Sequence, residues 1–206
     1  MSEFLRNQSC CDFVSALASA APVPGGGGAA AMAGALSAAL CSMAANLTVG
    51  KKKYADVEED IKALMAEAET IRLRLLELID EDATGFEPLA KAYAIPKDEP
   101  GRDEVMEECL RTAAAAPAEI FDLACRVIEM QYDFAKKGSR LMISDAATGA
   151  SFARAAMEGA AVNVKVNTRL MKDRAYADKI DAHIADSLKK YSAMAEETIQ
   201  YVWQQF

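Results

Sequence analysis

Four consecutive glycines, Gly25 to Gly28, stand directly before a long apolar segment and are the most unusual local feature of the sequence. Glycine frees the backbone and lets a ligand reach exposed N–H groups at the positive end of a helix. These residues are candidate binding residues; the alternative is a loop pressed closely against a neighbouring helix. The pattern is neither a Walker loop, because no GK[ST] follows, nor a dinucleotide fingerprint, because no strand precedes it.

Three lysines, Lys51, Lys52 and Lys53, follow Gly50 at the opposite end of the same apolar segment. Cations complement the negative end of a helix dipole, typically by ~0.3–1 kcal/mol each. Three in a row exceed that need in a chain whose formal net charge is −8. Binding of a carboxylate or a phosphate is therefore an equal alternative to helix capping.

An acidic run, Asp80, Glu81 and Asp82, lies late in the helix predicted after the lysines. Neighbouring helical positions diverge by ~100°, so the three acids cannot share one face. If Glu81 and nearby Glu77 face water, Asp82 turns inward, where burial or a second charge shifts its pKa towards a range useful for acid/base catalysis. The plainer alternative is a solvated acidic surface.

Two further polar groups come later in the chain. Ser144 and Asp145 open a helix after an apolar LMI segment, where capping is the simplest role for either. Asn163 and Asn167 are four residues apart and so share one helix face, among small and apolar residues. Buried amides require partners, which are either a neighbouring helix or a ligand rich in donors and acceptors.

Other kinds of site are poorly supported. The single histidine, His183, lies in a predicted helix of alternating charge that is typical of a solvated surface, which argues against Ser/His/Asp and Cys/His triads. The cysteines are odd in number and contain no CxxC pair, which favours reduced thiols in a cytoplasm over disulfides or a zinc site: Cys10, Cys11, Cys41, Cys109 and Cys125. A pI near 4.8 argues against non-specific binding to nucleic acid.

The elements that must position these residues are all predicted to be helices. The 206 residues are 52% hydrophobic but only 7% aromatic, a mixture rich in helix-forming alanine, leucine and methionine. We expect one all-α domain over residues 1–206, a helical bundle around a buried alanine-rich helix. The pattern and the prolines predict helices at residues 4–21, 29–49, 54–93, 102–116, 117–137, 144–171 and 176–205.

The alanine-rich segment 29–49 carries no charge and has the length of a membrane span. Alanine contributes little to membrane insertion, Asn46 and two serines interrupt the segment, and no aromatic belt flanks it. We therefore predict a helix at the centre of the bundle, approached closely by other helices on all sides. The N-terminal residues lack the basic and apolar regions of a secretory signal.

The order of these signals identifies a family. PVPGGGGAAAMAGAL, NLTVGKKKY, LIDEDATGF with AYAIPKD, SDAATGA and NVKVN resemble the formiminotetrahydrofolate cyclodeaminase and methenyltetrahydrofolate cyclohydrolase family over nearly the whole chain. The resemblance implies an all-helical fold, a homodimer and a folate substrate. It places the family's glycine-rich turn, basic pair, acid/base aspartate and later polar elements on Pro24, Gly25, Gly26, Gly27, Gly28, Lys51, Lys52, Asp82, Ser144, Asp145, Asn163 and Asn167.

Gly28 stands where many family members, the deaminases especially, have serine. In this respect the chain resembles the free-standing cyclohydrolases. The implied reaction is hydrolysis of 5,10-methenyltetrahydrofolate to 10-formyltetrahydrofolate, with no metal and no cofactor beyond the folate. Asp82 would accept and return a proton, Asp145 would hold the cationic substrate, and Lys51 and Lys52 would bind glutamate carboxylates or the developing oxyanion.

Two alternatives remain open at this stage. A 5-formimidoyltetrahydrofolate cyclodeaminase would use the same Asp82 but close the ring and release ammonia. A non-catalytic helical dimer would bind folate or a protein partner, with the glycines and lysines serving only in packing and capping. Spacing in the sequence does not separate the three.

Overall fold

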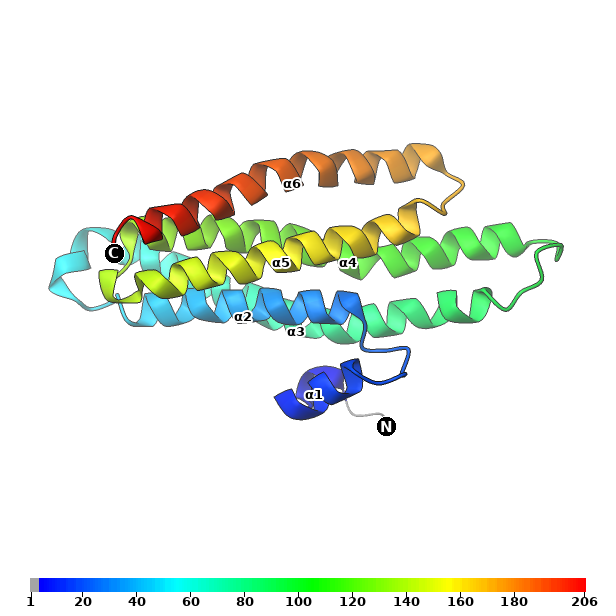
Figure 1. The fold of residues 1–206 in the computed structure, drawn as a ribbon, viewed down its shortest axis with the longest axis horizontal. Helices are drawn as coiled ribbons and strands as arrows, with labels where there is room; N and C mark the ends of the chain where they lie inside the picture. The colour runs from blue at the N-terminus through cyan, green and yellow to red at the C-terminus, as the bar shows by residue number, and fades with distance from the viewer. Residues whose placement is uncertain (1–3) are drawn as a thin grey trace.

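The computed structural model describes residues 4–206, and every regular element in this range is a helix (Figure 1). The described range contains the α-helices α1 (Cys10–Leu17), α2 (Gly26–Asn46), α3 (Glu58–Ala92), α4 (Arg102–Lys137), α5 (Ile143–Thr168) and α6 (Arg174–Trp203). Short 3-10 helices precede α1, α3 and α5: η1 (Leu5–Asn7), η2 (Lys52–Val57) and η3 (Arg140–Met142). The predicted all-α fold is confirmed. Residues 1–3 of the expected domain lie outside the described range.

Helices α2 to α5 form an up-and-down bundle in which each helix packs against the next and α2 also packs against α5. Helix α6 covers α4 and α5 from outside, and the short helix η1 before α1 packs against α3 at the edge of the bundle (Figure 1). Helix α2 is shorter than its neighbours and begins part-way along α3 and α5. Beyond its N-terminus the space between α3, α4 and α5 is therefore not filled by a fourth long helix.

Helix α2 is buried on one side and open on the other. Ala31, Ala38 and Cys41 are fully buried towards α3, α4 and α5, whereas Leu36 and Met43 are exposed. The helix passes the length and hydropathy test for a membrane span, but just over half of that window (56%) is buried inside the bundle. It is a core helix as predicted; the expected packing on all sides was wrong, because within the described chain one face has no neighbour.

Several helix boundaries differ from the sequence prediction. The N-terminal helix is split, because Ser9 caps a new helix by accepting a hydrogen bond from the Asp12 N–H. Residues 102–116 and 117–137 were predicted as two helices but form the single helix α4, with Pro117 inside it. Gly50, which follows α2, has a φ of 78°, the left-handed conformation in which glycine commonly ends a helix.

Pro117 is tolerated inside α4 because the side chain of another helix bonds the carbonyl that proline leaves free. Proline has no N–H to donate to the residue four positions earlier, here Ala113. The Asn167 amide of α5 donates to the Ala113 carbonyl oxygen at 3.4 Å. The carbonyl is thus partnered and α4 continues without a break.

Candidate active site

A pocket of about 200 Å³ lies at the N-terminus of α2, in the space that α2 does not fill. Four segments line it: the loop before α2 with the first residues of α2, the C-terminal third of α3, the centre of α4 and the C-terminal part of α5. Its lining residues are Pro22, Val23, Gly25, Gly26, Gly27, Asp82, Phe86, Ala113, Pro117, Asn163, Val166 and Asn167. The structure thus brings together the glycine loop, Asp82 and the two asparagines, which are far apart in the sequence.

Among residues 4–206, Asp82 is the only ionisable residue that lines this pocket. Burial raises the pKa of its carboxyl above the ordinary value of 3.8, because desolvation disfavours the charged form. A hydrogen bond with the backbone of Gly28 opposes the shift and lowers the pKa, but by less. The inward orientation proposed from the helical periodicity is thus present, and its consequence is a carboxyl with raised proton affinity.

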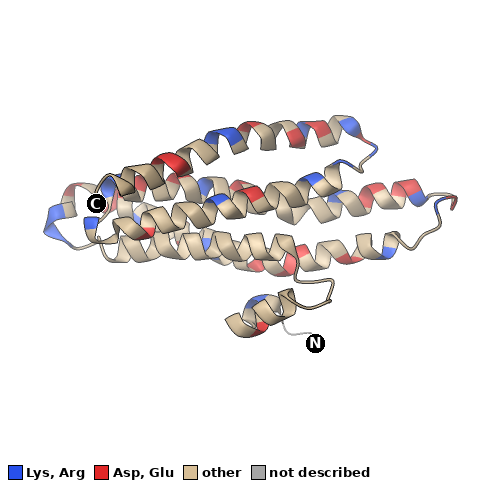
Figure 2. Cartoon of the chain, in the orientation of Figure 1, with Lys and Arg blue, Asp and Glu red and all other residues tan. Residues whose placement is uncertain are grey.

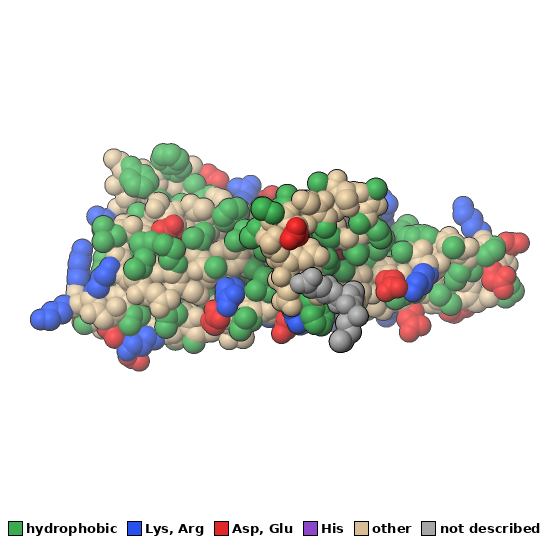
Figure 3. Space-filling model, turned by 90° about the horizontal axis from the view of Figure 1, so that it is seen from below, with side chains coloured by type: hydrophobic (Ala, Val, Ile, Leu, Met, Phe, Trp, Pro, Cys, Tyr) green, Lys and Arg blue, Asp and Glu red, His purple; other side chains and the backbone are tan. Residues whose placement is uncertain are grey.

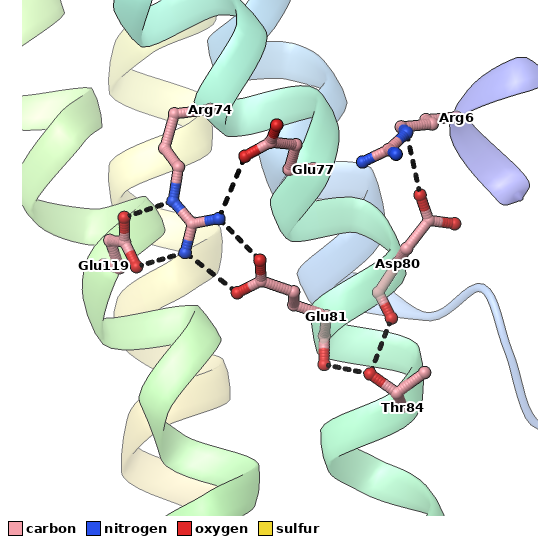
Figure 4. A network of polar contacts seen from close by, with 7 residues as sticks. All are labelled: Arg6, Arg74, Glu77, Asp80, Glu81, Thr84 and Glu119. Atoms are coloured by element: carbon pink, nitrogen blue, oxygen red, sulfur yellow. Dashed lines mark hydrogen bonds and ion pairs between the residues drawn. The ribbon is translucent and has the colours of Figure 1, made fainter.

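The neighbouring acids of α3 are engaged elsewhere (Figure 4). Arg74 holds Glu81 at 2.5 Å and also contacts Glu77 and Glu119 of α4. Asp80 points to the N-terminal segment, where it accepts the Leu5 N–H at 2.7 Å. The acidic run therefore divides into three directions, and only its third member reaches the pocket.

The glycines make room for the polar groups of the pocket. A Cβ atom on Gly27 would overlap the Asp82 carboxylate, and one on Gly26 would lie 3.1 Å from the Asn163 amide nitrogen. Gly28 would meet its neighbours only at ordinary van der Waals distance, and Gly25 faces open space. Gly26 and Gly27 thus fit the close-packing alternative, but the groups that pack against them are Asn163 and Asp82 of the candidate site.

Asn163 and Asn167 bond along their own helix through their amide nitrogens. Asn163 donates to the Gly159 carbonyl at 2.8 Å, and Asn167 donates to the Asn163 carbonyl at 2.9 Å. Within residues 4–206 neither side-chain oxygen receives a hydrogen bond. The pocket therefore offers two amide acceptors beside one carboxyl.

The remaining predicted site residues lie at the other end of the bundle. Lys51 and Lys52 follow the C-terminus of α2, and Ser144 and Asp145 stand in the first turn of α5. Helix α2 has 21 residues, and a helix of that length spans ~30 Å at 1.5 Å per residue. One chain therefore does not bring these four residues to Asp82, and Asp145 does not contribute to the pKa shift of Asp82.

Comparison with known proteins places this arrangement in a family. Residues 9–186 match the family model described as formiminotransferase-cyclodeaminase. The chain belongs to the formiminotransferase-cyclodeaminase family. The resemblance inferred from the motifs is thereby confirmed.

Several relatives cover nearly the whole chain. A protein of Methylorubrum extorquens named methenyltetrahydrofolate cyclohydrolase is 38% identical over 200 residues, which are 95% of this chain and 96% of that protein. The formimidoyltransferase-cyclodeaminase of Mus musculus is 28% identical over 93% of this chain, which spans only 36% of the length of that relative. The crystal structure of formiminotetrahydrofolate cyclodeaminase from Thermotoga maritima superposes with a TM-score of 0.81 at 28% identity, covering 97% of this chain and 96% of that one.

The sequence did not predict the apolar residues that line the pocket. Val23, Phe86, Pro117 and Val166 line it but carry no chemical signal of their own. Phe86 could have been predicted from the sequence, because it lies four residues after Asp82 and so on the same face of α3. The lining residues of α4 could not, since nothing in the sequence indicates which helices surround the start of α2.

His183 and the cysteines lie outside the pocket. His183 is exposed and lies 2.8 Å from Asp122 on the surface between α4 and α6, as expected of a solvated helix. All five cysteines are free, and burial raises the pKa of the Cys41 and Cys125 thiols, which disfavours the reactive thiolate. In residues 4–206 no three His, Cys, Asp or Glu side chains gather as a metal site would require.

Proposed function

We propose that this protein hydrolyses 5,10-methenyltetrahydrofolate to 10-formyltetrahydrofolate. The proposal rests on one observation above all: a single carboxyl of raised pKa stands alone in a pocket with amide acceptors and glycine backbone around it. The 38% identity to a protein named methenyltetrahydrofolate cyclohydrolase, over nearly all of both chains, supports this choice of substrate. The pocket supplies the group that the chemistry needs.

The reaction adds water to the methenyl carbon between N5 and N10, which is an amidinium-like electrophile. A carbon–oxygen bond forms as the water loses a proton to the Asp82 carboxylate. The N5–carbon bond then breaks, N5 takes a proton back from the Asp82 carboxyl, and the hydroxyl oxygen releases the second proton as the formyl group forms. Such a general acid/base typically contributes ~10²–10⁴-fold to the rate.

The environment of Asp82 suits both halves of this cycle. Desolvation raises the pKa of the carboxyl towards neutral pH, and the higher pKa makes the carboxylate a better base. Its negative charge in a partly apolar pocket also attracts the cationic substrate. The free side-chain oxygens of Asn163 and Asn167 are matched to N–H donors on the edge of the pterin ring.

Hydrolysis by this route needs only the substrate and water, so the proposal includes no metal and no further cofactor. The tetrahydrofolate is the ligand, with one or several glutamates. We also propose that the protein acts in the cytoplasm and has no nucleic-acid or membrane partner.

We propose further that the protein works as a homodimer. Helix α2 carries no charged residue along its length (Figure 2), and its exposed side chains include Leu36 and Met43. Phe152, Val162 and Val166 of α5 are exposed in the same way. A two-fold axis through the middle of this α2/α5 face would place the C-terminus of one α2 opposite the N-terminus of the other.

That arrangement gives the distant site residues a role. Lys51 and Lys52 are exposed and pair with no acid among residues 4–206, while the Asp82 pocket contains no cation. Across the two-fold axis, these lysines of one copy approach the pocket of the other, together with Ser144 and Asp145. We assign the lysines to an anionic group, either the developing oxyanion or the glutamate carboxylates.

The ammonia-releasing cyclodeaminase is the second candidate, since the Thermotoga maritima structure of that name shares the fold over nearly all of both chains. The two activities are separated by supplying each folate to the purified protein. We expect loss of the near-ultraviolet band of 5,10-methenyltetrahydrofolate and no ammonia from 5-formimidoyltetrahydrofolate. Ammonia release without methenyl hydrolysis would show a cyclodeaminase, and folate binding without either reaction would show a binding protein.

A further inference from the structure

A second hollow of about 460 Å³ lies beside the Asp82 pocket, between α3 and the N-terminal segment that precedes α1. Phe4 and Leu5 of that segment form one wall, and Ala90 lies on the α3 side. Three lining residues, Pro22, Val23 and Phe86, belong to both cavities, which are therefore adjacent. Figure 3 shows the side of the molecule on which the N-terminal segment and α1 lie, with hydrophobic side chains exposed around them. We call this hollow the second pocket.

The size of the Asp82 pocket requires such a neighbour. Pockets for ligands of drug size have volumes of ~300–1,000 Å³, and the Asp82 pocket holds about 200 Å³. A folate consists of a pterin ring, an aminobenzoyl ring attached at N10, and glutamate. The Asp82 pocket has room for the pterin end only. The aminobenzoyl ring must therefore extend into an adjacent cavity, past residues that line both.

The lining of the second pocket is suited to an aromatic ring. Phe4 and Phe86 are 54% and 37% exposed although both are large and apolar. The Arg6 guanidinium lies over one face of the Phe4 ring at 4.6 Å, so a ligand meets the exposed remainder of that ring. Aromatic rings stack or meet edge to face, which contributes ~0.5–1.5 kcal/mol beyond the burial of area. Leu5 and Pro22 complete an apolar surface between the two phenylalanines.

Asp80 gives the second pocket one carboxylate oxygen that receives no hydrogen bond from residues 4–206. Its Oδ1 atom accepts the Leu5 N–H, and its buried Oδ2, without a hydrogen bond in that range, forms an ion pair with the Arg6 Nε at 3.5 Å. The amide N–H that joins the benzoyl ring to glutamate is a donor of the matching kind. The charged residues among those that line the pocket, Asp80 and Glu87, are both acids that pair with Arg6 and Lys91. The lining offers no cation to the glutamate carboxylates, which therefore belong outside it.

We propose that the second pocket binds the aminobenzoyl ring of the folate while the Asp82 pocket holds the pterin and the methenyl carbon. The assignment rests on the proposed function of the Asp82 pocket. It makes the N-terminal segment a specificity element for folates rather than a peripheral arm. The Leu5–Asp80 hydrogen bond fixes this segment against α3, and so sets the width of the second pocket.

The test compares two substrates in one variant. Ala90→Phe fills the second pocket from an exposed position two helical turns beyond Asp82, and Ala182→Phe makes the same change at an exposed alanine of α6. One substrate is 5,10-methenyltetrahydrofolate; the other carries a methyl group on N10 in place of the benzoylglutamate. For Ala90→Phe we expect KM for the full folate to rise ~10-fold while kcat/KM for the truncated substrate stays unchanged. Ala182→Phe should change neither.

A second variant and a binding measurement test the same assignment without relying on Ala90→Phe kinetics alone. Phe4→Ala removes one aromatic wall and should also raise KM for the full folate alone. Titration calorimetry with p-aminobenzoylglutamate should detect binding to the parent protein and its loss in Ala90→Phe. Equal effects on both substrates, or unchanged KM and unchanged p-aminobenzoylglutamate binding in Ala90→Phe, would overturn the assignment.

The titration also separates this assignment from the proposed reaction. Binding of p-aminobenzoylglutamate that is lost in Ala90→Phe supports the second pocket even if the parent protein hydrolyses neither substrate. Hydrolysis of both substrates with no difference between the parent protein and Ala90→Phe would retain the reaction and refute the pocket.

Discussion

At the level of single residues, helix α3 directs three consecutive acids to three different partners. Glu81 is bound by Arg74, Asp80 holds the N-terminal segment, and Asp82 alone faces the pocket. The contact between Asp82 and Gly27 requires the absence of a side chain on the glycine. The acid and the glycine loop therefore form one unit, although 55 positions separate them in the sequence.

The raised pKa of Asp82 predicts a gain in stability when the charge is removed. The folded-state pKa lies above the unfolded value, so the folded protein binds this proton more tightly and loses stability as pH rises through the folded pKa. Asp82→Asn should therefore raise the melting temperature at neutral pH. Below about pH 3, well under the unfolded-state pKa of ~3.9, both states are protonated and the difference should vanish. Melting curves at the two pH values check this, and a lower melting temperature for the variant at neutral pH would contradict it.

The sequence predicted part of the site at this scale. Helical periodicity together with the family motifs was enough to select Asp82 and the asparagine pair, because residues four apart share a face. It was not enough to show that Gly27 packs on Asp82, or that the second pocket exists. Both depend on how the N-terminal segment and α2 meet α3, and such contacts between distant segments leave no local pattern.

At the level of helices, α5 supplies a hydrogen bond that α4 lacks. Asn167 of α5 partners the Ala113 carbonyl that Pro117 leaves free in α4, and all three residues line the pocket. The sequence prediction ended a helix before Pro117 because proline usually interrupts one. The compensating amide lies 50 residues further along the chain, so the continuity of α4 could not be read locally.

This pairing predicts coupled effects on stability. Asn167→Ala should destabilise the fold by ~1–3 kcal/mol, because it leaves the buried Ala113 carbonyl without a donor. Pro117→Ala restores a backbone N–H that bonds the same carbonyl. In the Pro117→Ala background, Asn167→Ala should therefore cost ~1 kcal/mol less, as measured by urea denaturation of the four proteins. Additive free-energy changes would show that the two residues act separately.

The contact between α2 and α3 gives a sharper test of the glycine loop. Gly27→Ala places a methyl group where the Asp82 carboxylate lies and should lower turnover by displacing it. Gly159→Ala is the matched control, because its Cβ would lie at an ordinary 3.5 Å from Ala30 Cβ. We expect a loss of at least ~10²-fold in kcat for the first, comparable to loss of the general base, and near-parent values for the second. Similar rates in both variants would remove Gly27 from the account.

At the scale of the whole molecule, the central question is why predicted site residues occupy two ends of one bundle. The family motifs name the residues but not the chain that supplies each one. In the proposed homodimer a second copy supplies the missing end, because a two-fold axis beside the uncharged helix α2 exchanges the two ends of α2. Sequence patterns indicate that a face is apolar, but they do not show what covers it.

A mixed dimer tests this arrangement. One chain carries Asp82→Asn and the other carries Lys51→Met with Lys52→Met, so each homodimer should be defective. If lysines act across the interface, the mixed dimer contains one intact site and should show about half of the parent turnover. Purification by two different affinity tags isolates it. An inactive mixed dimer, from parents whose homodimers are both folded and dimeric, would place the two groups in the same chain or remove the lysines from the site.

The most direct test of the account is the initial rate of methenyl loss at neutral pH for the parent protein, Asp82→Asn and Glu81→Gln. The neighbouring Glu81 is the control because it pairs with Arg74 and faces away from the pocket. We predict a fall of at least ~10²-fold for Asp82→Asn, with the fold intact by circular dichroism, and less than ~2-fold for Glu81→Gln. Turnover by folded Asp82→Asn at the rate of the parent protein would contradict the claim that this carboxyl carries the proton.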